Sequence, residues 1–282
     1  MYTLKIENKN GDILNLSTNP AYTVFKIDGL TPVDASLNFS ELANFDGAIY
    51  NSGRLGMRNI VLYIKIHNPA EENRIGLYKY FPPKNQVRIY YKNDHRDVYI
   101  DGYVEKFECD LFSVNEFVQV SILCPLPYWI DTEKTEIKFN HIESLFEFPF
   151  AISEEGIEFS RIIKDNTNYF NNSGTEIGLL IEFTAKANQI LNPRFYNRTT
   201  QKYFGVNFDM NDGDIIQIST FKGNKFVKLI RKGIESNIID KRQAGSEWLT
   251  LTPGTNELTF ESDEGEINLD VTMTTYRYFE GV

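Results

Sequence analysis

The chain has 282 residues and a formal charge of −10 at pH 7, with 39 acidic against 29 basic residues. A surface that binds nucleic acid must be basic to displace counterions from phosphates, so this balance argues against a nucleic-acid-binding protein. Two cysteines are too few for a disulfide framework or a zinc site. The length exceeds that of one typical domain, so we expect two domains.

The beginning of the chain, MYTLKIENKNG, lacks the basic region and the apolar core of a signal peptide. No apolar run approaches the ~20 residues that a membrane-spanning helix needs. We therefore expect synthesis and folding in the cytoplasm and no membrane insertion.

The first half is predicted to be an antiparallel β meander with one helix packed against it. Apolar and polar residues alternate at Tyr2, Leu4 and Ile6, and a Gly-containing turn follows at residues 10–12. Further strand patterns occupy residues 22–27, 35–39, 87–91, 98–104 and 117–124, and Gly102 is expected to mark a bulge. The segment 47–58, rich in Gly, Asn, Ser and Arg, predicts a long loop or arm.

The clearest local unit is a strand over residues 60–66 followed by a short helix. Asn68 is expected to cap the helix, with Pro69 in its first position and Glu71 completing a capping box. Pro82 and Pro83 then end it, because proline cannot donate a backbone hydrogen bond. The predicted apolar stripe of the helix consists of Ala70, Leu77, Tyr78 and Phe81.

The second half reads as an all-β sandwich or jelly roll, with strands separated by frequent turn signals. Prolines in CPLPYW interrupt the last strand of the first half, and the polar residues 131–134 have the composition of a linker. We therefore place the domain boundary near residue 133, which gives domains over residues 1–133 and 134–282.

No catalytic, metal or cofactor site is predicted. The three histidines are too far apart in sequence for a local metal motif. Glu154, Glu155 and Glu158 could be imagined as the carboxylates of a glycosidase, but their clustering is more typical of a solvated acidic face. Neither a nucleophile elbow nor a phosphate loop is present. An enzyme is disfavoured, and a site assembled from distant residues remains open.

Several longer segments carry a resemblance to a known family. In the first half they are RNIVLYIKI, NPAEENRIGLYKYF, VYIDGYVEKFECDLF and VQVSILCPLPYW. In the second half they are FNNSGTEIGLLIEF, NDGDIIQIST, KFVKLIRKG, SEWLTLTPGTNELTF and the closing YFEGV. Together, in this order and spacing, they resemble the distal tail proteins of bacteriophages with long, non-contractile tails, over nearly the whole chain.

The resemblance implies a structural virion protein with no enzymatic activity. Its fold would be mainly β, with an N-terminal antiparallel sandwich or barrel-like domain bearing one short helix, then a C-terminal galectin-like sandwich. Residues 1–133 would form a hexameric ring, alone or with a second ring back to back, and residues 134–282 would point outward.

The resemblance also implies the partners and the location. The ring would join the tail tube protein to the tail-tip or baseplate proteins and anchor receptor-binding proteins. DNA would pass through it without specific binding. The protein would be assembled in the cytoplasm of the host bacterium and reside at the tip of the phage tail.

Two groups of residues are candidates for the assembled ring. Because a basic lining would retard passing DNA, we expect some of the acids at helix-start and turn positions to face the lumen; these are Glu71, Glu72, Asp94 and Asp97. The arm over residues 47–58 is expected to contact a neighbouring subunit. Arginine suits bidentate pairing with a neighbour's carboxylates, so the interface candidates are Arg54, Arg58 and the adjacent Asn59.

Two alternative functions remain open at this level. A carbohydrate-binding module contributing to host-surface adhesion would use Trp129, Trp248 or exposed tyrosines as stacking platforms, although no galectin-type His/Asn/Arg cluster precedes Trp248. A hydrolase acting on the host wall would need a carboxylate pair.

Overall fold

The computed structural model describes residues 2–44, 46–111, 116–144, 160–164 and 167–282. The predicted acidic cluster at residues 154–158 lies outside these ranges. The fold is mainly β with a single α-helix among the described residues, as the sequence predicted. No described helix is long and apolar enough to cross a membrane.

Two compact units make up the chain, residues 1–133 with 278–282, and residues 134–277. The sequence had assigned the last five residues to the second domain. The chain passes between the units inside two strands, β10 (Trp129–Lys138) and β23 (Leu269–Phe279). The predicted linker at 131–134 is therefore wrong. Its polar composition was misleading because Asp131 is a buried strand residue that accepts a hydrogen bond from the backbone of Glu133.

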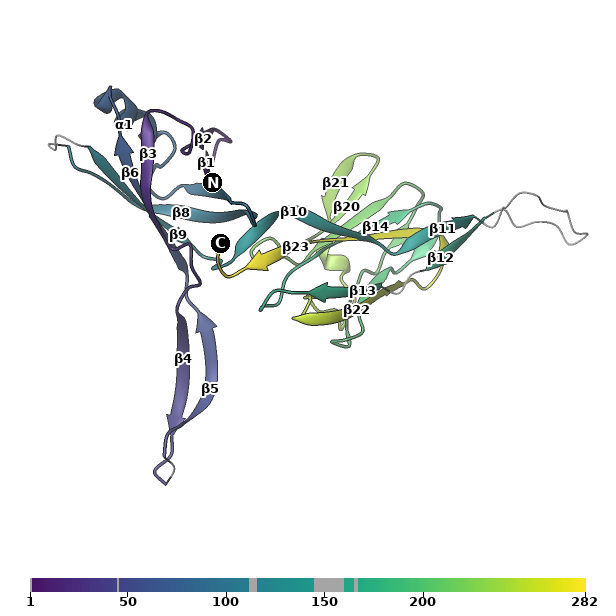
Figure 1. Ribbon diagram of the computed structural model, residues 1–282. Helices are drawn as coiled ribbons and strands as arrows, with labels where there is room; N and C mark the ends of the chain where they lie inside the picture. Colours follow the sequence, from purple (N-terminus) through teal and green to yellow (C-terminus); the bar gives the residue numbers. More distant parts are fainter. Residues whose placement is uncertain (1, 45, 112–115, 145–159, 165–166) are drawn as a thin grey trace, which may run out of the picture. The chain divides into compact units, whose positions relative to one another are not determined.

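The first unit is built on one antiparallel sheet (Figure 1). Its strands are β1 (Thr3–Asn8), β2 (Ile13–Asn15), β3 (Tyr22–Asp28), β6 (Arg58–Ile66), β7 (Gln86–Lys92), β8 (Asp97–Cys109) and β9 (Phe117–Cys124). They pair in the order β2-β1-β7-β8-β9-β6-β3, and β10 also pairs with the start of β8. Because the first half of β8 pairs with β7 and the second half with β9, the sheet can fold around one apolar core.

The bulge in β8 lies between Val104 and Lys106, not at the predicted Gly102. Gly102 sits in regular register opposite Val87. A side chain at this glycine would meet Ile122 at 2.6 Å, so close packing of β9 explains the glycine.

Strand β6 buries Ile60, Leu62, Ile64 and Ile66, which confirms the predicted alternation. The helix α1 (Ala70–Tyr78) follows, but the predicted Asn68 cap is wrong, because Pro69 occupies the N-cap and no side chain caps the helix. Instead, the Asn73 side chain donates to the His67 carbonyl oxygen. Within the predicted stripe, Leu77 and Phe81 are buried and Ala70 packs on the core, whereas Tyr78 is exposed.

The described residues of the second unit form two main antiparallel sheets and two smaller sheets of two strands each. Its strands are β11 (Asn140–Ser144), β12 (Ser160–Lys164), β13 (Thr167–Asn171), β14 (Leu180–Ala185), β15 (Ile190–Leu191), β16 (Arg194–Asn197), β17 (Lys202–Gly205), β18 (Asp209–Met210), β19 (Ile215–Ser219), β20 (Phe226–Arg231), β21 (Ile234–Asn237) and β22 (Gly254–Glu261), with β23. One main sheet runs β23-β14-β19-β20-β21 and the other β13-β22-β16-β17. Alternate residues from both sheets are buried, among them Phe183, Phe195 and Phe260. This is the predicted galectin-like sandwich architecture.

Candidate assembly surface

A two-stranded hairpin projects from the body of the first unit (Figure 1). It consists of β4 (Ala35–Glu41) and β5 (Ala48–Leu55), which pair with each other and form a sheet of their own. Every described residue from Ala35 to Arg54 is exposed. The segment 47–58, which the sequence predicted as a loop or arm, is thus mainly the second strand of this hairpin. From here on we call the whole hairpin, residues 35–55, the arm.

The arm has one apolar and one polar face. Residues directly opposite each other in an antiparallel pair share a face, and the register pairs Leu37 with Gly53 and Phe39 with Tyr50. The rings of Phe39 and Tyr50 contact at 5.9 Å, and about half of each large side chain is exposed. The opposite face carries Ser36, Asn38, Ser40, Ser52 and Arg54, with Ile49 as its large apolar residue.

The root of the arm is fixed by Arg58, which is fully buried. Its guanidinium donates to the backbone carbonyl oxygens of Gly29, Thr31, Pro127 and Glu280, at 2.8 Å for Pro127 and 2.6 Å for Thr31. These carbonyls belong to the β3–β4 connection, the segment before β10 and the C-terminal tail. Arg58 therefore ties three separate chain segments to the first residue of β6.

Burial of Arg58 lowers the pKa of its guanidinium, because desolvation disfavours the charged form. The carbonyl dipoles and the ring of Trp129, whose centroid is 5.9 Å from the guanidinium carbon, offset that cost. The sequence-based assignment of Arg58 to a neighbour's carboxylates is therefore wrong. A fully buried guanidinium with four backbone partners in its own chain cannot reach another subunit.

Gly29 completes the root of the arm. Its φ is +89°, and a Cβ built on it would lie 2.1 Å from the Asn59 carbonyl oxygen, so only glycine fits. The structure does not group the other two interface candidates. Arg54 lies on the polar face of the arm, whereas Asn59 belongs to β6, where its side-chain oxygen is 3.0 Å from Ser121 Oγ.

The four predicted lumen acids are exposed but are not brought together. Glu71 and Glu72 lie in the first turn of α1, which packs near the C-terminal end of β8. Asp94 and Asp97 lie at the other end of that thirteen-residue strand, where Asp97 pairs with Lys92 at 2.6 Å. Their position in a lumen stays a prediction.

The two tryptophans are poor stacking platforms for a sugar. Trp129 is fully buried, which excludes it. Trp248 is half-buried, with its ring 4.9 Å from that of the buried Phe204 and the Lys225 ammonium 5.3 Å from its centroid. Since glycan stacking needs an open aromatic face, this environment gives the carbohydrate-binding alternative no support.

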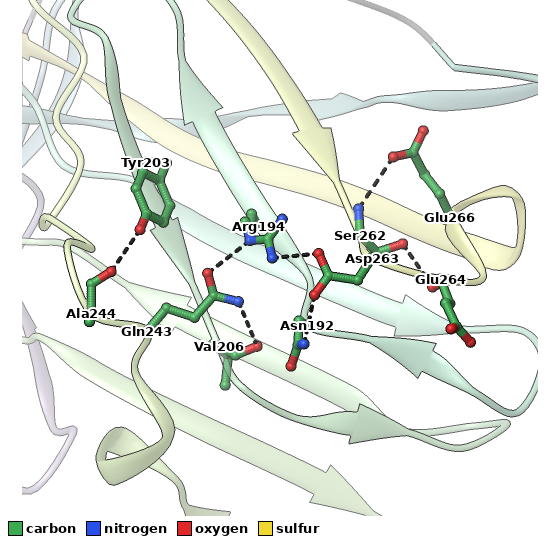
Figure 2. Close-up of polar contacts among 10 residues, drawn as sticks. All are labelled: Asn192, Arg194, Tyr203, Val206, Gln243, Ala244, Ser262, Asp263, Glu264 and Glu266. Atoms are coloured by element: carbon green, nitrogen blue, oxygen red, sulfur yellow. Dashed lines mark hydrogen bonds and ion pairs between the residues drawn. The ribbon is translucent and has the colours of Figure 1, made fainter.

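A polar network on the second unit is the other place where a sugar could be sought (Figure 2). Arg194 donates to Gln243 Oε1 at 2.8 Å and pairs with Asp263, whose second oxygen accepts from Asn192 at 2.7 Å. These contacts lower the pKa of the Asp263 carboxyl, first through Asn192 and then through Arg194. Because the guanidinium, amide and carboxylate groups already bond to one another, their role is to tie β16 to the segments that carry Gln243 and Asp263.

The chain is similar to known proteins in both sequence and fold. A model of the phage tail protein RIFT-related domain matches residues 9–124, and one of the siphovirus-type tail component, C-terminal domain, matches residues 173–278. The crystal structure of the Dit protein of phage SPP1 is similar over 99% of both chains, with a TM-score of 0.68 and 13% identity. The chain belongs to the siphovirus distal tail protein (Dit) family.

Two further structures share this Dit fold. They are chains of the phage P2 baseplate in its activated conformation, one with Ca and one with Sr. They match over 100% of both chains, with TM-scores of 0.62 and 0.61 and identities of 11% and 10%. No curated protein matches the chain by sequence. The family and the fold inferred from the sequence are confirmed, and the chain has a structural role in the distal tail or baseplate.

Proposed function

We propose that this Dit chain is the hub of a siphophage tail tip, with the first unit forming a hexameric ring between the tail tube and the tip proteins. The observation that carries the proposal is the arm. A two-stranded hairpin is marginally stable alone in water, yet this one leaves large apolar side chains half exposed. Such a surface is expected where another protein covers it.

Arg58 and Gly29 support the same reading. A flexible loop would need no buried arginine at its root, whereas an arm that must meet a partner in one geometry needs a fixed base. Four hydrogen bonds from one guanidinium supply that base. The six-fold order itself comes from the family resemblance and is part of the proposal.

In the assembled tail, the ring would contact the tail tube protein on one side and the tail-tip proteins on the other. The second unit would point outward and anchor receptor-binding proteins. The net charge of −10 suits a ring through which DNA passes without binding. This role requires no catalytic group. The polar network bonded within itself and the half-buried Trp248, packed on Phe204, leave sugar binding without support.

Immunogold electron microscopy of the phage that encodes the chain tests the location. Antibodies raised against the purified protein are expected to label the distal end of the tail. Antibodies against the tail tube protein serve as the control and should decorate the shaft. Label confined to the capsid or the shaft would contradict the hub assignment.

A further inference from the structure

The end of strand β23 and the three residues after it pack on the first unit, and we call residues 278–282 the strap. The ring of Tyr278 stacks on that of Tyr128 at 5.9 Å. The guanidinium carbon of Arg96 lies 4.0 Å from the centroid of the Phe279 ring, which also packs against the core. The turn between β7 and β8 and the segment before β10 therefore both hold the beginning of the strap.

The rest of the strap lies against the residues that lead into the arm. The backbone amide of Val282 donates to the Leu30 carbonyl oxygen at 3.2 Å. A Cβ built on Gly281 would lie 3.2 Å from that same oxygen, so the strap runs in close contact with the β3–β4 connection. The Glu280 carbonyl oxygen accepts a hydrogen bond from Arg58. The strap thus contacts the arm root both directly and through this arginine.

Arg58 couples the strap to the arm root because one guanidinium bonds to both. Three of its backbone acceptors precede residue 134 in the chain, and the fourth, Glu280, lies in the strap. A hydrogen bond from a charged donor contributes roughly a factor of ten or more to an equilibrium constant. Because coupling between two contacts is reciprocal, docking of the strap and fixing of the arm root stabilise each other.

The strap follows the whole second unit in the chain. Residues 134–277 separate it from the rest of the first unit. At ribosomal rates of about 5–20 residues per second, synthesis of the second unit takes about 7–30 s. During this interval the first unit has its arm and Arg58, but its strap has not been made.

We propose that the strap is a checkpoint built into the order of the chain: it fixes the arm at its root only after the second unit has been made, so that chains lacking the second unit stay out of the ring. The inference rests on the proposed ring and adds an order of events to it. An arm without a fixed base must be ordered when it meets its partner, and this ordering costs conformational entropy that opposes assembly.

Hydrogen exchange of the full-length protein, followed by mass spectrometry, tests the coupling at the arm root. Phe279→Ser removes the ring that lies under Arg96. In this variant we expect the amides of the strap, and those of residues 27–34 and 54–60 around the arm root, to exchange at least tenfold faster than in the native protein.

Two controls accompany this variant. Phe170→Ser makes the same change in the second unit, where the ring is 66% exposed, and should leave all these rates unchanged. The far end of the β6–β9 pairing, where Lys65 lies opposite Phe117, reports whether the first unit is folded and should keep its native rate. If Phe279→Ser does not fold, Gly281→Val serves in its place, because it crowds the Leu30 carbonyl oxygen without removing a core side chain.

Native mass spectrometry of a tagged variant, coexpressed with the native chain, tests entry into the ring. Tagged Phe279→Ser is expected in rings at least tenfold less often than tagged Phe170→Ser. Fast exchange in the strap with native rates at the arm root, or equal entry of both variants, would overturn the checkpoint and leave the hub intact. A native chain that forms no ring would contradict the hub, and exchange at the arm root would then alone decide whether the strap fixes the arm.

Discussion

Replacing Arg58 should strongly destabilise the first unit, although sequence alone marks it as a surface residue. In Arg58→Met the side chain keeps much of its length and loses every donor. Four backbone carbonyls then lack their partner; that of Pro127 is buried, and the other three are partly buried. An unsatisfied buried acceptor costs about 1–3 kcal/mol.

The four losses will not add fully, because the variant is also spared the desolvation of a charge. A hydrogen bond to a charged group contributes about 1.5–3 kcal/mol, and because the four do not add fully we expect a total loss of about 3 kcal/mol. The stability of Arg58→Lys should fall between that of Arg58→Met and that of the native protein, since an ammonium has three donors on one atom and cannot reach four separate carbonyls.

Urea unfolding followed by fluorescence measures this change cleanly. The two tryptophans lie one in each unit, so a Trp248→Phe background reports the first unit through Trp129, which sits beside Arg58. Lys92→Met is the matched control, because it removes an exposed ion pair worth about 0–1 kcal/mol. A loss below about 1 kcal/mol for Arg58→Met, equal to the control, would refute the role of Arg58 as the fixed base of the arm.

Three further predictions concern single residues. Gly29→Ala should destabilise the first unit by about 3 kcal/mol in urea unfolding, because it adds a clash to a positive φ; Gly11→Ala, with a φ of +84° and open space, should cost about 1 kcal/mol. Burial raises the pKa of Cys124 to about 12, so Ellman's reagent should leave this thiol unmodified in the native protein, and rapid labelling would contradict this. The free energy of unfolding should fall as pH rises from about 9 towards 12, because in that range only the thiol of the unfolded chain ionises. Hydrogen bonds from Arg231 lower the pKa of Asp214. Asp214→Asn should therefore lower the free energy of unfolding by about 1–2 kcal/mol at neutral pH, a value discounted for the partly exposed arginine. The difference in stability from native protein should vanish as pH falls below the lowered pKa; a difference that persists in acid would show that packing, not charge, is lost.

Period-two patterns made most of the fold predictable. Alternation identified β6, because burial of every second residue leaves a direct trace in the sequence. The helix was also recognised, but its start was not. Asn68 has the right chemistry for a cap, yet Pro69 takes that position, and only the path of the chain decides between them.

The candidate site was harder to predict for a physical reason. Arg54 and Arg58 are four residues apart and look alike in sequence, but one lies on an exposed strand and the other in the core. The partners of Arg58 lie as far as residue 280, so no local pattern marks them. Likewise, residues 131–134 looked like a linker because an acid usually signals solvent.

The arm shows what a closer reading of the sequence could have found. Residues 35–41 alternate, and once the register is known Leu37, Phe39 and Tyr50 share one face, whereas Ile49 lies on the other. That register includes a shift between Asn38 and Phe39, which moves Tyr50 opposite Phe39. A single bulge thus decides which face is apolar, and bulges leave little trace in sequence.

Native mass spectrometry of the purified full-length chain tests the central claim most directly. The account predicts a dominant species near 196 kDa, which is six times the 32.6 kDa of one chain, or twice that mass if two rings stack. Phe39→Ser combined with Tyr50→Ser, which removes the two exposed aromatic rings of the arm, should shift the protein to 32.6 kDa while circular dichroism stays that of the native fold. A native chain that remains at 32.6 kDa at micromolar concentration would contradict the account.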